Sequence, residues 1–395
     1  MRSYTSNSNC QCPDGPWRKT WLGAMVLTLA LLVGWEGTLR SLGHRPTVVD
    51  DMALWAAQRD RVYTDCCERA VVLLGDCRMQ LGLVPPILAE RFPGYRVVQL
   101  AVQETSPVAA LRDLAADENF NGIVVCALNA RLLCKDMWDT QQPYVDYYHR
   151  KYSLNEKLNR FFSILVQRTF TIVHPQLRLD DLVVHLVKEG RLPSPYYIET
   201  HADRSRLADY SGVDLEAHRA YALGRANWLY TGRSLPSSVR WLEDAMEVEG
   251  WVKAIQARGG RVIFVQFPTT GANLRFDEFM FPKARYWDAF AAQTSALCLH
   301  FAEVPELSGF DCPDTSHLDR TEAPRFTLEL GKVLEDHGLL GTPLCVVASA
   351  QGAGPQAKCP CHSTGGHRGK SAQCLHCAPG SARQSIHHKT ASERS

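Results

Sequence analysis

Five short runs of apolar, β-branched residues, separated by helical patterns, constrain the fold of this 395-residue chain more than any other feature. Each run is nearly continuous in apolar residues, which is typical of strands buried on both faces of a parallel sheet. Their alternation with helices predicts an α/β protein with a doubly wound, mostly parallel five-stranded sheet. The expected strands are Ala70–Leu74, Tyr95–Val102, Gly122–Leu128, Arg261–Phe267 and a run around Leu297–Ala302.

Three helices are expected around these strands. A helical pattern over Met79–Arg91 follows the first strand directly. A second helix is expected to open with Ser106 as its cap and Pro107 at its first position, where the missing N–H of proline has no cost. The last helix is expected from Thr321 to about His337.

The stretch from 137 to about 240 breaks this rhythm. It is rich in Tyr, His and Arg, and it is far longer than a crossover needs. We expect a helical insertion that partly covers the carboxyl edge of the sheet, within one α/β domain over 46–341. Residues 1–16 are polar and residues 345–395 hold few large apolar side chains, so both segments are expected to be disordered.

An uncharged apolar run from Trp21 to Trp35 follows two basic residues and ends at Glu36. As a helix it spans about 22 Å, less than the roughly 30 Å hydrocarbon core, but a tryptophan at each end suits the two interfaces. We expect a single-pass membrane anchor over 17–38, with the N-terminus in the cytoplasm and the main domain extracytoplasmic, that is, periplasmic. A cleaved signal peptide is the alternative, although the small-x-small trio Ser41–Gly43 lies well past the run.

Composition and charge exclude several classes of protein. A formal net charge of +1 indicates no nucleic-acid partner. The 14 cysteines are scattered along a long chain, unlike those of a small disulfide scaffold. A disulfide between Cys298 and Cys312 is possible, and the sequence does not decide whether it forms. The chain has no nucleotide-binding loop and no zincin motif, and the Cys/His groups at 359–362 and 374–377 lack the usual zinc spacing. We expect neither a cofactor nor a metal. The histidines of the insertion also lack metal-ligand spacing: His149, His174, His185, His201 and His218.

The first strand runs into Gly75 and Asp76, then Cys77, where a helix begins at once. A residue at such a turn lies at the carboxyl edge of the sheet, where open α/β folds bind ligands. Gly75 permits the sharp turn, and the positive end of the new helix stabilises a thiolate or a developing oxyanion at Cys77. Cys77 is therefore a candidate nucleophile, with an ordinary packed cysteine as the alternative. Asp76 is expected to bond the backbone of the turn.

The loop before the final helix carries Asp314 and His317. Three residues apart in such a turn, the carboxylate can contact one imidazole nitrogen and leave the other free to face a nucleophile. We expect Asp314 to orient His317, and His317 to act first as general base and then as general acid. A loop histidine that caps the last helix is the alternative.

Taken together, the two motifs resemble those of the SGNH (GDSL) hydrolases. Residues 73–79 (LLGDCRM) resemble the first block of that family, and residues 314–317 (DTSH) resemble its last. The resemblance covers roughly 68–340 without the insertion, and it implies a flavodoxin-like sheet that carries an acyl-transfer site. With the N-terminal anchor, the chain is most similar to exported branches such as the periplasmic alginate O-acetylation proteins and the D-alanine transfer protein of teichoic acids. Those proteins work beside membrane-bound O-acyltransferases.

The sequence departs from the family's pattern at three places. Cys77 stands where the family has a serine. The oxyanion-hole glycine, expected after the second strand, has no counterpart at 103–105. Asn129 is the candidate for the oxyanion asparagine, without the usual glycine two positions before it. The resemblance therefore implies the Cys77 amide and Asn129 as oxyanion donors.

Two further groups are candidates for contact with a substrate. Arg78 could hold an anionic group, although a solvated arginine on a helix face is the more ordinary interpretation. Arg285, Tyr286 and Trp287 could line an acceptor groove, because aromatic rings stack well on sugar faces. Packing of these aromatic residues is an equal alternative.

The leading hypothesis is an extracytoplasmic SGNH-type acyltransferase or esterase that acts on a cell-envelope polymer, such as a polysaccharide, beside a membrane-bound O-acyltransferase. The alternative is a non-catalytic SGNH-like binding or scaffold protein of an envelope O-acylation system. The missing glycine and the serine-to-cysteine change favour that alternative. A cytosolic thioesterase would require the apolar N-terminal run to be something other than a targeting segment.

Overall fold

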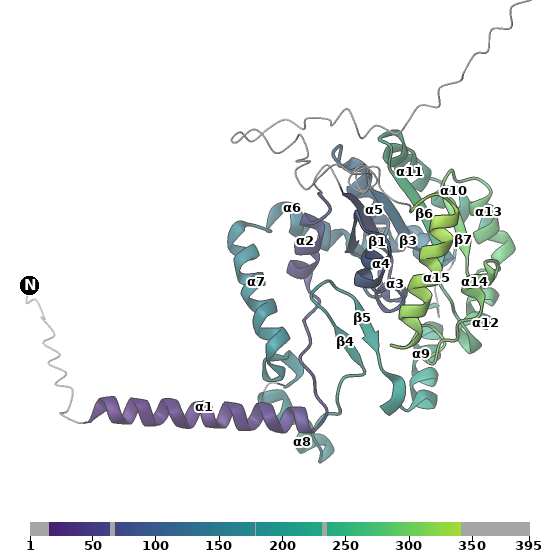
Figure 1. Cartoon of the computed structure of the whole chain (residues 1–395). Helices are drawn as coiled ribbons and strands as arrows, with labels where there is room; N and C mark the ends of the chain where they lie inside the picture. Colours follow the sequence, from purple (N-terminus) through teal and green to yellow (C-terminus); the bar gives the residue numbers. More distant parts are fainter. Residues whose placement is uncertain (1–15, 64–67, 178, 231–234, 341–395) are drawn as a thin grey trace, which may run out of the picture. The chain divides into compact units, whose positions relative to one another are not determined.

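The computed structural model describes residues 16–63, 68–177, 179–230 and 235–340 (Figure 1). The tail at 345–395 with its Cys/His groups, and residues 1–15 of the polar N-terminal segment, lie outside these ranges, so the disorder predicted for them stays a prediction. The chain divides into two compact units, of which one comprises the residues up to Val48 together with Leu165–Tyr196. The other comprises Val49–Ile164 and the residues from Tyr197 onward.

The larger unit is built on a five-stranded sheet in which each neighbouring pair of strands is parallel. In spatial order, the strands are β2 (Tyr95–Gln99), β1 (Arg69–Leu74), β3 (Ile123–Ala127), β6 (Arg261–Gln266) and β7 (Leu297–His300). Counted along the chain within this sheet, the order is the 2-1-3-4-5 of flavodoxin-like folds. The predicted fold class, a doubly wound α/β protein, is confirmed.

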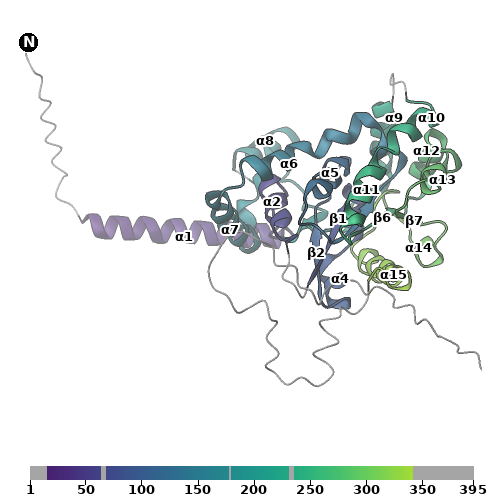
Figure 2. The ribbon, with the colours of Figure 1, turned by 90° about the horizontal axis from the view of Figure 1, so that it is seen from above.

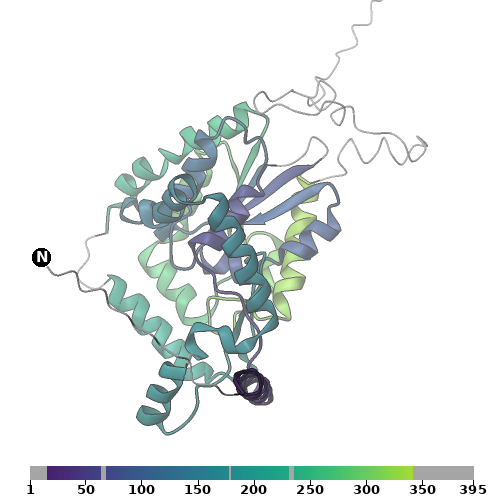
Figure 3. The ribbon, with the colours of Figure 1, turned by 90° about the vertical axis from the view of Figure 1, so that its left-hand side faces the viewer.

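Alternate residues of each strand enter two separate cores, because side chains of a strand point to opposite faces. In β1, Val72 and Leu74 belong to one cluster, whereas Val71 and Leu73 belong to the other. All four side chains are fully buried. Helices therefore cover both faces of the sheet, as Figures 2 and 3 show, which explains why the strands are apolar without interruption.

Two sets of helices form these outer layers. The first core includes residues of α2 (Met52–Asp60), α5 (Val108–Ala116), α10 (Ser238–Ala245), α11 (Val248–Ala257) and α13 (Trp287–Ala291). The second core includes residues of α3 (Cys77–Gly82), α4 (Pro85–Arg91), α14 (Pro305–Ser308) and α15 (Glu322–Asp336). The last helix occupies almost the predicted range, with Thr321 and His337 as its caps.

The single helix predicted over Met79–Arg91 is in fact two helices, α3 and α4. The residues between them, Leu83 and Val84, have extended backbone conformations. Pro85 explains the break, because proline has no N–H to donate and disfavours a helical conformation in the residue before it.

The helix predicted to open at Pro107 begins one residue later. Pro107 is the N-cap of α5 and Val108 its first residue. The Ser106 hydroxyl accepts only a long bond of 3.4 Å from the Val108 N–H, and it donates to the Leu132 carbonyl at 2.6 Å. The serine thus ties the start of α5 to the segment after β3 instead of acting as a regular cap.

The stretch between β3 and β6 holds the predicted helices and an antiparallel hairpin that the sequence did not predict. The hairpin pairs β4 (Ile198–Thr200) with β5 (Arg206–Ala208). Besides α10 and α11, the helices described in this stretch are η1 (Ala130–Leu133), η2 (Lys135–Gln141), α6 (Gln142–Arg150), α7 (Leu154–Thr169), η3 (Thr171–Val173), η4 (Pro175–Leu177), α8 (Leu179–Glu189), η5 (Tyr210–Gly212) and α9 (Leu215–Tyr230). After β6 come α12 (Gly271–Met280) and η6 (Lys283–Arg285).

The smaller unit contains α1 (Trp17–Ser41), a 25-residue helix. Its most apolar window has a mean hydropathy of 1.6 and is almost entirely exposed, so the helix is long and apolar enough to span a membrane. Leu39 is its only buried residue. A signal sequence would have the same length and composition, so the single-pass anchor and the orientation of the helix both stay predictions.

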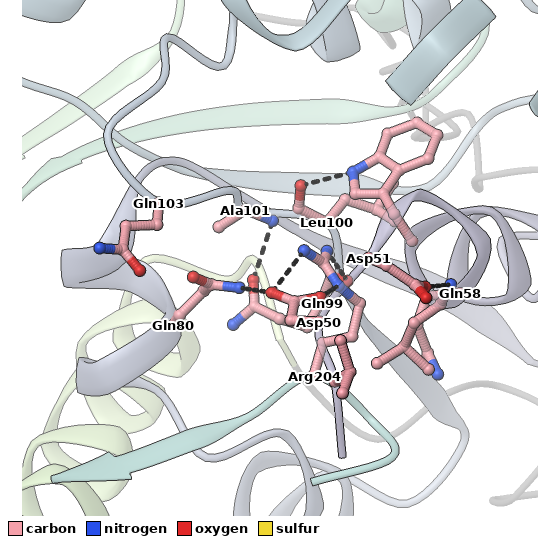
Figure 4. A network of polar contacts seen from close by, with 12 residues as sticks. Asp50, Asp51, Gln58, Gln80, Gln99, Leu100, Ala101, Gln103 and Arg204 are labelled. Carbon is pink, nitrogen blue, oxygen red and sulfur yellow. Dashed lines mark hydrogen bonds and ion pairs between the residues drawn. The ribbon is translucent and has the colours of Figure 1, made fainter. Parts of the chain in front are cut away.

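A buried polar network in the larger unit joins α3, β2 and the β4–β5 hairpin (Figure 4). Arg204, in the hairpin loop, is fully buried and donates to both carboxylate oxygens of Asp50, at 2.6 and 3.0 Å. It also donates to the Gln99 carbonyl at 3.1 Å. Gln80 donates to the same Asp50 carboxylate at 2.7 Å. Because Gln80 lies one turn after Cys77, this network fixes the helix that begins at Cys77.

Replacing Arg204 by Met is expected to lower the free energy of unfolding by about 3 kcal/mol, because removing one partner of a buried ion pair leaves the other without compensation. Denaturant unfolding followed by circular dichroism measures this change. Lys332→Met is the control, since Lys332 pairs with Glu329 on the surface and should contribute under about 1 kcal/mol. Equal, small losses in both variants would contradict a structural role for Arg204.

Candidate active site

Cys77 lies at the tight turn from β1 into α3. Gly75 has a φ of +147°, and a Cβ at this position would come within 2.8 Å of the Ala127 Cβ, so only glycine fits. The Asp76 carboxylate caps α3 by accepting from the Arg78 N–H at 2.9 Å. Cys77 is the first helical residue, and the amide of that residue has no acceptor within its own helix. The turn therefore presents both the thiol and an N–H at the carboxyl edge of the sheet.

Asp314 organises the loop that carries His317. One carboxylate oxygen accepts from the backbone N–H of Ser316 at 2.9 Å and of His317 at 2.7 Å. The other oxygen contacts the His317 Nδ1 at 2.7 Å. The turn puts Thr315 at a φ of +74°, which is unfavourable for a β-branched residue. A strained turn thus holds the carboxylate and the imidazole together.

The second imidazole nitrogen lies within hydrogen-bonding distance of the thiol. The His317 Nε2 lies 3.0 Å from the Cys77 Sγ, although the two residues are 240 positions apart in the sequence. Asp314, His317 and Cys77 therefore form one continuous chain of polar contacts. This is the geometry of a base that can move a proton to and from a nucleophile.

The loop of His317 is tied to the segment that follows β6. The Thr270 N–H donates to the Thr315 carbonyl at 3.0 Å, and the Cys312 thiol lies 3.4 Å from the Pro268 carbonyl. Asn273, on α12, donates to the Ser316 hydroxyl at 2.5 Å. Because β6 and this loop both end at the same edge of the sheet, these bonds fix the imidazole above it.

Tyr210 is a residue of the site that sequence reasoning missed. Its hydroxyl donates to the same Asp314 oxygen that contacts His317, at 2.8 Å. His218 lies 3.8 Å from that oxygen, so the predicted surface or core role for this histidine needs correction to a place beside the site. Both residues come from the insertion, and no motif near them in the sequence points to Asp314.

These contacts shift the pKa values of the buried pair. Burial by itself raises the pKa of Asp314, but the bonds from His317, the Ser316 backbone and Tyr210 hold it far below its usual range. Burial by itself lowers the pKa of His317, but the negative charge of Cys77 and the contact with Asp314 raise it to about 10. The contacts with Asp314 and Cys77 therefore favour the protonated imidazole, whose Nε2 lies 3.0 Å from the sulfur.

The pKa of His317, followed by NMR through the imidazole Cε1 proton, is expected to lie near 10 and to fall in Cys77→Ala. The substitution removes the negative sulfur and leaves the burial, which acts in the opposite direction. Cys298→Ala is the control, because Cys298 is on β7 and should leave the titration of His317 unchanged. If Cys77→Ala left the pKa of His317 unaltered, the sulfur and the imidazole would not be coupled.

Asn129, the predicted oxyanion donor, lies at the same edge as Cys77. Leu74 pairs with Cys126 in the β1–β3 register, and Cys77 and Asn129 each follow three residues later. The Asn129 side-chain oxygen accepts from the Leu132 N–H at 3.0 Å and caps η1. This bond leaves the Nδ2 group as the end of the side chain that could donate to a substrate.

The place where the resemblance implies a glycine holds Glu104 in a conformation typical of glycine. Its φ of +59° is rare for a residue with a side chain. The Thr105 hydroxyl accepts from Gln141 at 2.9 Å, and Gln141 also donates to the Gly75 carbonyl at 3.0 Å. The backbone at this position thus has a shape that favours glycine, although the residue is a glutamate.

Arg78 differs from the expected solvated arginine. Its side chain is only 15% exposed and lies 3.4 Å from Asp277 of α12. Burial raises the pKa of Asp277, an effect that the charge of Arg78 opposes. Sequence reasoning did not single out Asp277, because this residue belongs to neither motif and lies 40 positions before His317. The pair places one positive and one negative group beside the turn of Cys77.

The aromatic residues predicted to line an acceptor groove belong to the core. Tyr286 packs edge-on against Trp241, with ring centroids 5.0 Å apart, and Trp287 packs against His300 at 5.7 Å. Both side chains are over 90% buried. The substrate-binding prediction is therefore wrong for Tyr286 and Trp287, whereas Arg285 is exposed on η6.

Cys298 and Cys312, left open as a possible bridge, are both free thiols. Burial raises the pKa of each to about 12, so neither competes with Cys77 as a nucleophile. Among the described residues, no group of three or more His, Cys, Asp or Glu side chains is placed to hold a metal ion.

Comparisons with known proteins add little to this geometry. No family model matches the chain, and no curated protein matches it. Among solved structures, the chain is similar to one titled "Crystal Structure of TesA", at 14% identity and a TM-score of 0.31, over 68% of this chain and 99% of that one. A TM-score this low supports no conclusion about this chain, and the class of fold rests on the topology of the sheet.

Proposed function

We propose that this chain is an SGNH-type acyltransferase or esterase that uses a cysteine nucleophile. The observation that carries the proposal is the unbroken contact from Asp314 through His317 to Cys77, at 2.7 and 3.0 Å. Each member has the environment its role requires: a buried, ionised carboxylate, a protonated imidazole and a sulfur at a helix N-terminus.

In the proposed first step, the Cys77 thiolate attacks the carbonyl carbon of an ester or thioester. A C–S bond forms, and the carbonyl oxygen becomes an oxyanion held by the Cys77 N–H and the Asn129 amide. As the tetrahedral intermediate collapses, the bond to the leaving group breaks and the His317 Nε2 gives that group its proton. The product is an acyl-thioester on Cys77.

In the second step, an acceptor hydroxyl attacks the thioester. His317, now neutral, takes the hydroxyl proton at Nε2, and the collapse of the intermediate expels the thiolate. The imidazolium and the thiolate are thereby restored. Water as acceptor makes the chain an esterase, and a sugar hydroxyl makes it a transferase. Asp314 and Tyr210 keep the imidazole in place throughout.

The proposed acceptor is a cell-envelope polymer such as a polysaccharide. The argument for this acceptor is the apolar helix α1, which supports attachment to a membrane. We place the larger unit outside the cytoplasm because basic residues precede the apolar run, and such residues tend to stay on the cytoplasmic side. A membrane-bound O-acyltransferase is the proposed source of the acyl group.

A non-catalytic scaffold protein is the second candidate. The residues at 103–105 include no glycine, and this favours the scaffold. The two candidates differ in the reactivity of Cys77: a catalytic thiolate is alkylated much faster than the buried thiols Cys126, Cys134 and Cys312, whereas a structural thiol is not.

Intact-protein mass spectrometry after incubation with p-nitrophenyl acetate tests the proposal. The expected result is a single acetyl adduct, mapped by peptide digestion to Cys77. Absence of any adduct under conditions in which the protein is folded would favour the scaffold.

A further inference from the structure

We infer that the smaller unit also docks on the surface of the lipid bilayer, through an apolar face beside the anchor helix. The inference rests on the proposed anchor α1 and adds a second contact with the membrane. We define the apolar face as the exposed side chains of the end of α7, η3, α8 and the residue before η3: Leu165, Val166, Phe170, Val173, Val183, Val184, Leu186 and Val187.

The exposure of this apolar face is unusual for a folded unit. Val187 is 80% exposed, and the other seven side chains are between 38% and 56% exposed. On α8 the spacing of Val183, Val184 and Val187 puts the three side chains on one side of the helix, and Glu189 lies on the opposite side. Soluble proteins rarely expose apolar side chains in such numbers, so this side of α8 is expected to have an occupant.

The anchor helix is fixed to the same unit at the residue where its apolar run ends. The Glu36 carboxylate accepts from the Thr171 N–H at 2.9 Å and from the Ile172 N–H at 3.0 Å. Arg40, one turn later, contacts both Glu36 and the Thr169 carbonyl at 2.7 Å. The start of η3 is thus held at the level where α1 would leave the hydrocarbon core.

The packing against α1 also determines where α8 lies along the axis of that helix. Leu182 of α8 and Leu177 pack with Leu39 of α1 in one small core, and Figure 1 shows α8 beside the C-terminal end of α1. Leu39 is four residues past Trp35, which corresponds to about 6 Å along the helix axis. Amphipathic helices lie about 5–10 Å deep at the boundary between headgroups and acyl chains. The packing against Leu39 therefore holds α8 in the headgroup layer, just outside the end of the apolar run, which is the layer that amphipathic helices occupy.

The charges near α8 indicate which bilayer surface it fits. Between 179 and 191 the sequence has the acids Asp180, Asp181 and Glu189 and the bases Lys188 and Arg191, a net charge of −1. Attraction to anionic lipid therefore contributes nothing to the binding of this face to the bilayer, which has to rest on apolar contact. We commit to a zwitterionic phospholipid surface as the occupant, and a second copy of the chain is an outcome of the test.

The test uses the full-length chain in phosphatidylcholine nanodiscs, with a benzophenone amino acid at one position at a time. Val187 tests the apolar face, Glu189 is the control on the opposite side of α8, and Leu27 reports the insertion of α1. All three positions are exposed, so the folded structure should tolerate the probe. After irradiation, mass spectrometry identifies lipid adducts, and gel electrophoresis detects crosslinked dimers.

Lipid adducts at Val187 and Leu27, several-fold above those at Glu189, are the expected result. Adducts at Leu27 with only the Glu189 level at Val187 would overturn the inference and leave the anchor intact. A crosslinked dimer at Val187 would assign the apolar face to a second copy and overturn it as well. A lack of adducts at Leu27 would show that α1 is not inserted, and the anchor and this inference would then both fail.

Discussion

Cys77→Ala is expected to form no acyl adduct with p-nitrophenyl acetate, whereas the unaltered chain gains one acetyl group. The substitution removes the sulfur that lies 3.0 Å from the His317 Nε2 and leaves the backbone of the turn in place. Among the other thiols of the described residues, Cys126, Cys134, Cys298 and Cys312 are poor nucleophiles, because burial raises the pKa of each. Intact mass spectrometry measures the adduct directly.

Two further variants make this test specific. Cys298→Ala is the matched control and should be acylated like the unaltered chain. Cys77→Ser should be acylated slowly, because a serine hydroxyl is far less acidic than a thiol. An adduct that persists in Cys77→Ala would place the reactive group elsewhere and would refute the proposed nucleophile.

The strands and the two ends of the site could be predicted because their signals are local. Continuous apolar runs such as Val71–Leu74 occur where both faces of a strand are covered, and this held for all five strands of the sheet. Gly75 before Cys77 and the spacing of Asp314 and His317 each describe one turn. Parallel strands end at one edge of a sheet, so the topology that was predicted also implies that these turns approach each other.

What sequence reasoning missed depends on contacts between distant segments. Tyr210 and Asp277 approach the site from the insertion and from α12, and neither is part of a recognisable motif. The strands of the β4–β5 hairpin have three residues each, too few for an alternating pattern to be visible. Tyr286 and Trp287 follow a strand near the active edge, but the composition of a loop does not indicate the direction in which its side chains pack.

The break between α3 and α4 is a different case, because its signal was present in the sequence. Pro85 and Pro86 stand in the middle of the helix that the apolar pattern predicted. The pattern continued across the prolines because both short helices bury their apolar sides in the same core. The conformational rule for proline outweighs hydrophobic periodicity when the two disagree.

Asp314→Asn is expected to slow the formation of the acetyl adduct by about a thousandfold, or about 4 kcal/mol in activation free energy. Asparagine keeps the shape of the side chain but removes the charge that stabilises the His317 imidazolium, so the pKa of His317 should fall as well. The rate of adduct formation at pH 7 measures the first effect, and NMR titration of His317 measures the second. Asp209→Asn is the control, because Asp209 is a partly exposed carboxylate whose ion pair is with Arg320.

Tyr210→Phe separates the role of the carboxylate from that of its neighbour. This variant removes one hydrogen bond to Asp314 and keeps the charge, so we expect a loss of about tenfold in the rate while the pKa of His317 stays raised. A graded series, with Asp314→Asn far below Tyr210→Phe and Asp209→Asn unchanged, is what an orienting carboxylate produces. Equal rates for Asp314→Asn and Asp209→Asn would mean that the thiol reacts without help from the pair, and the mechanism would have to be abandoned.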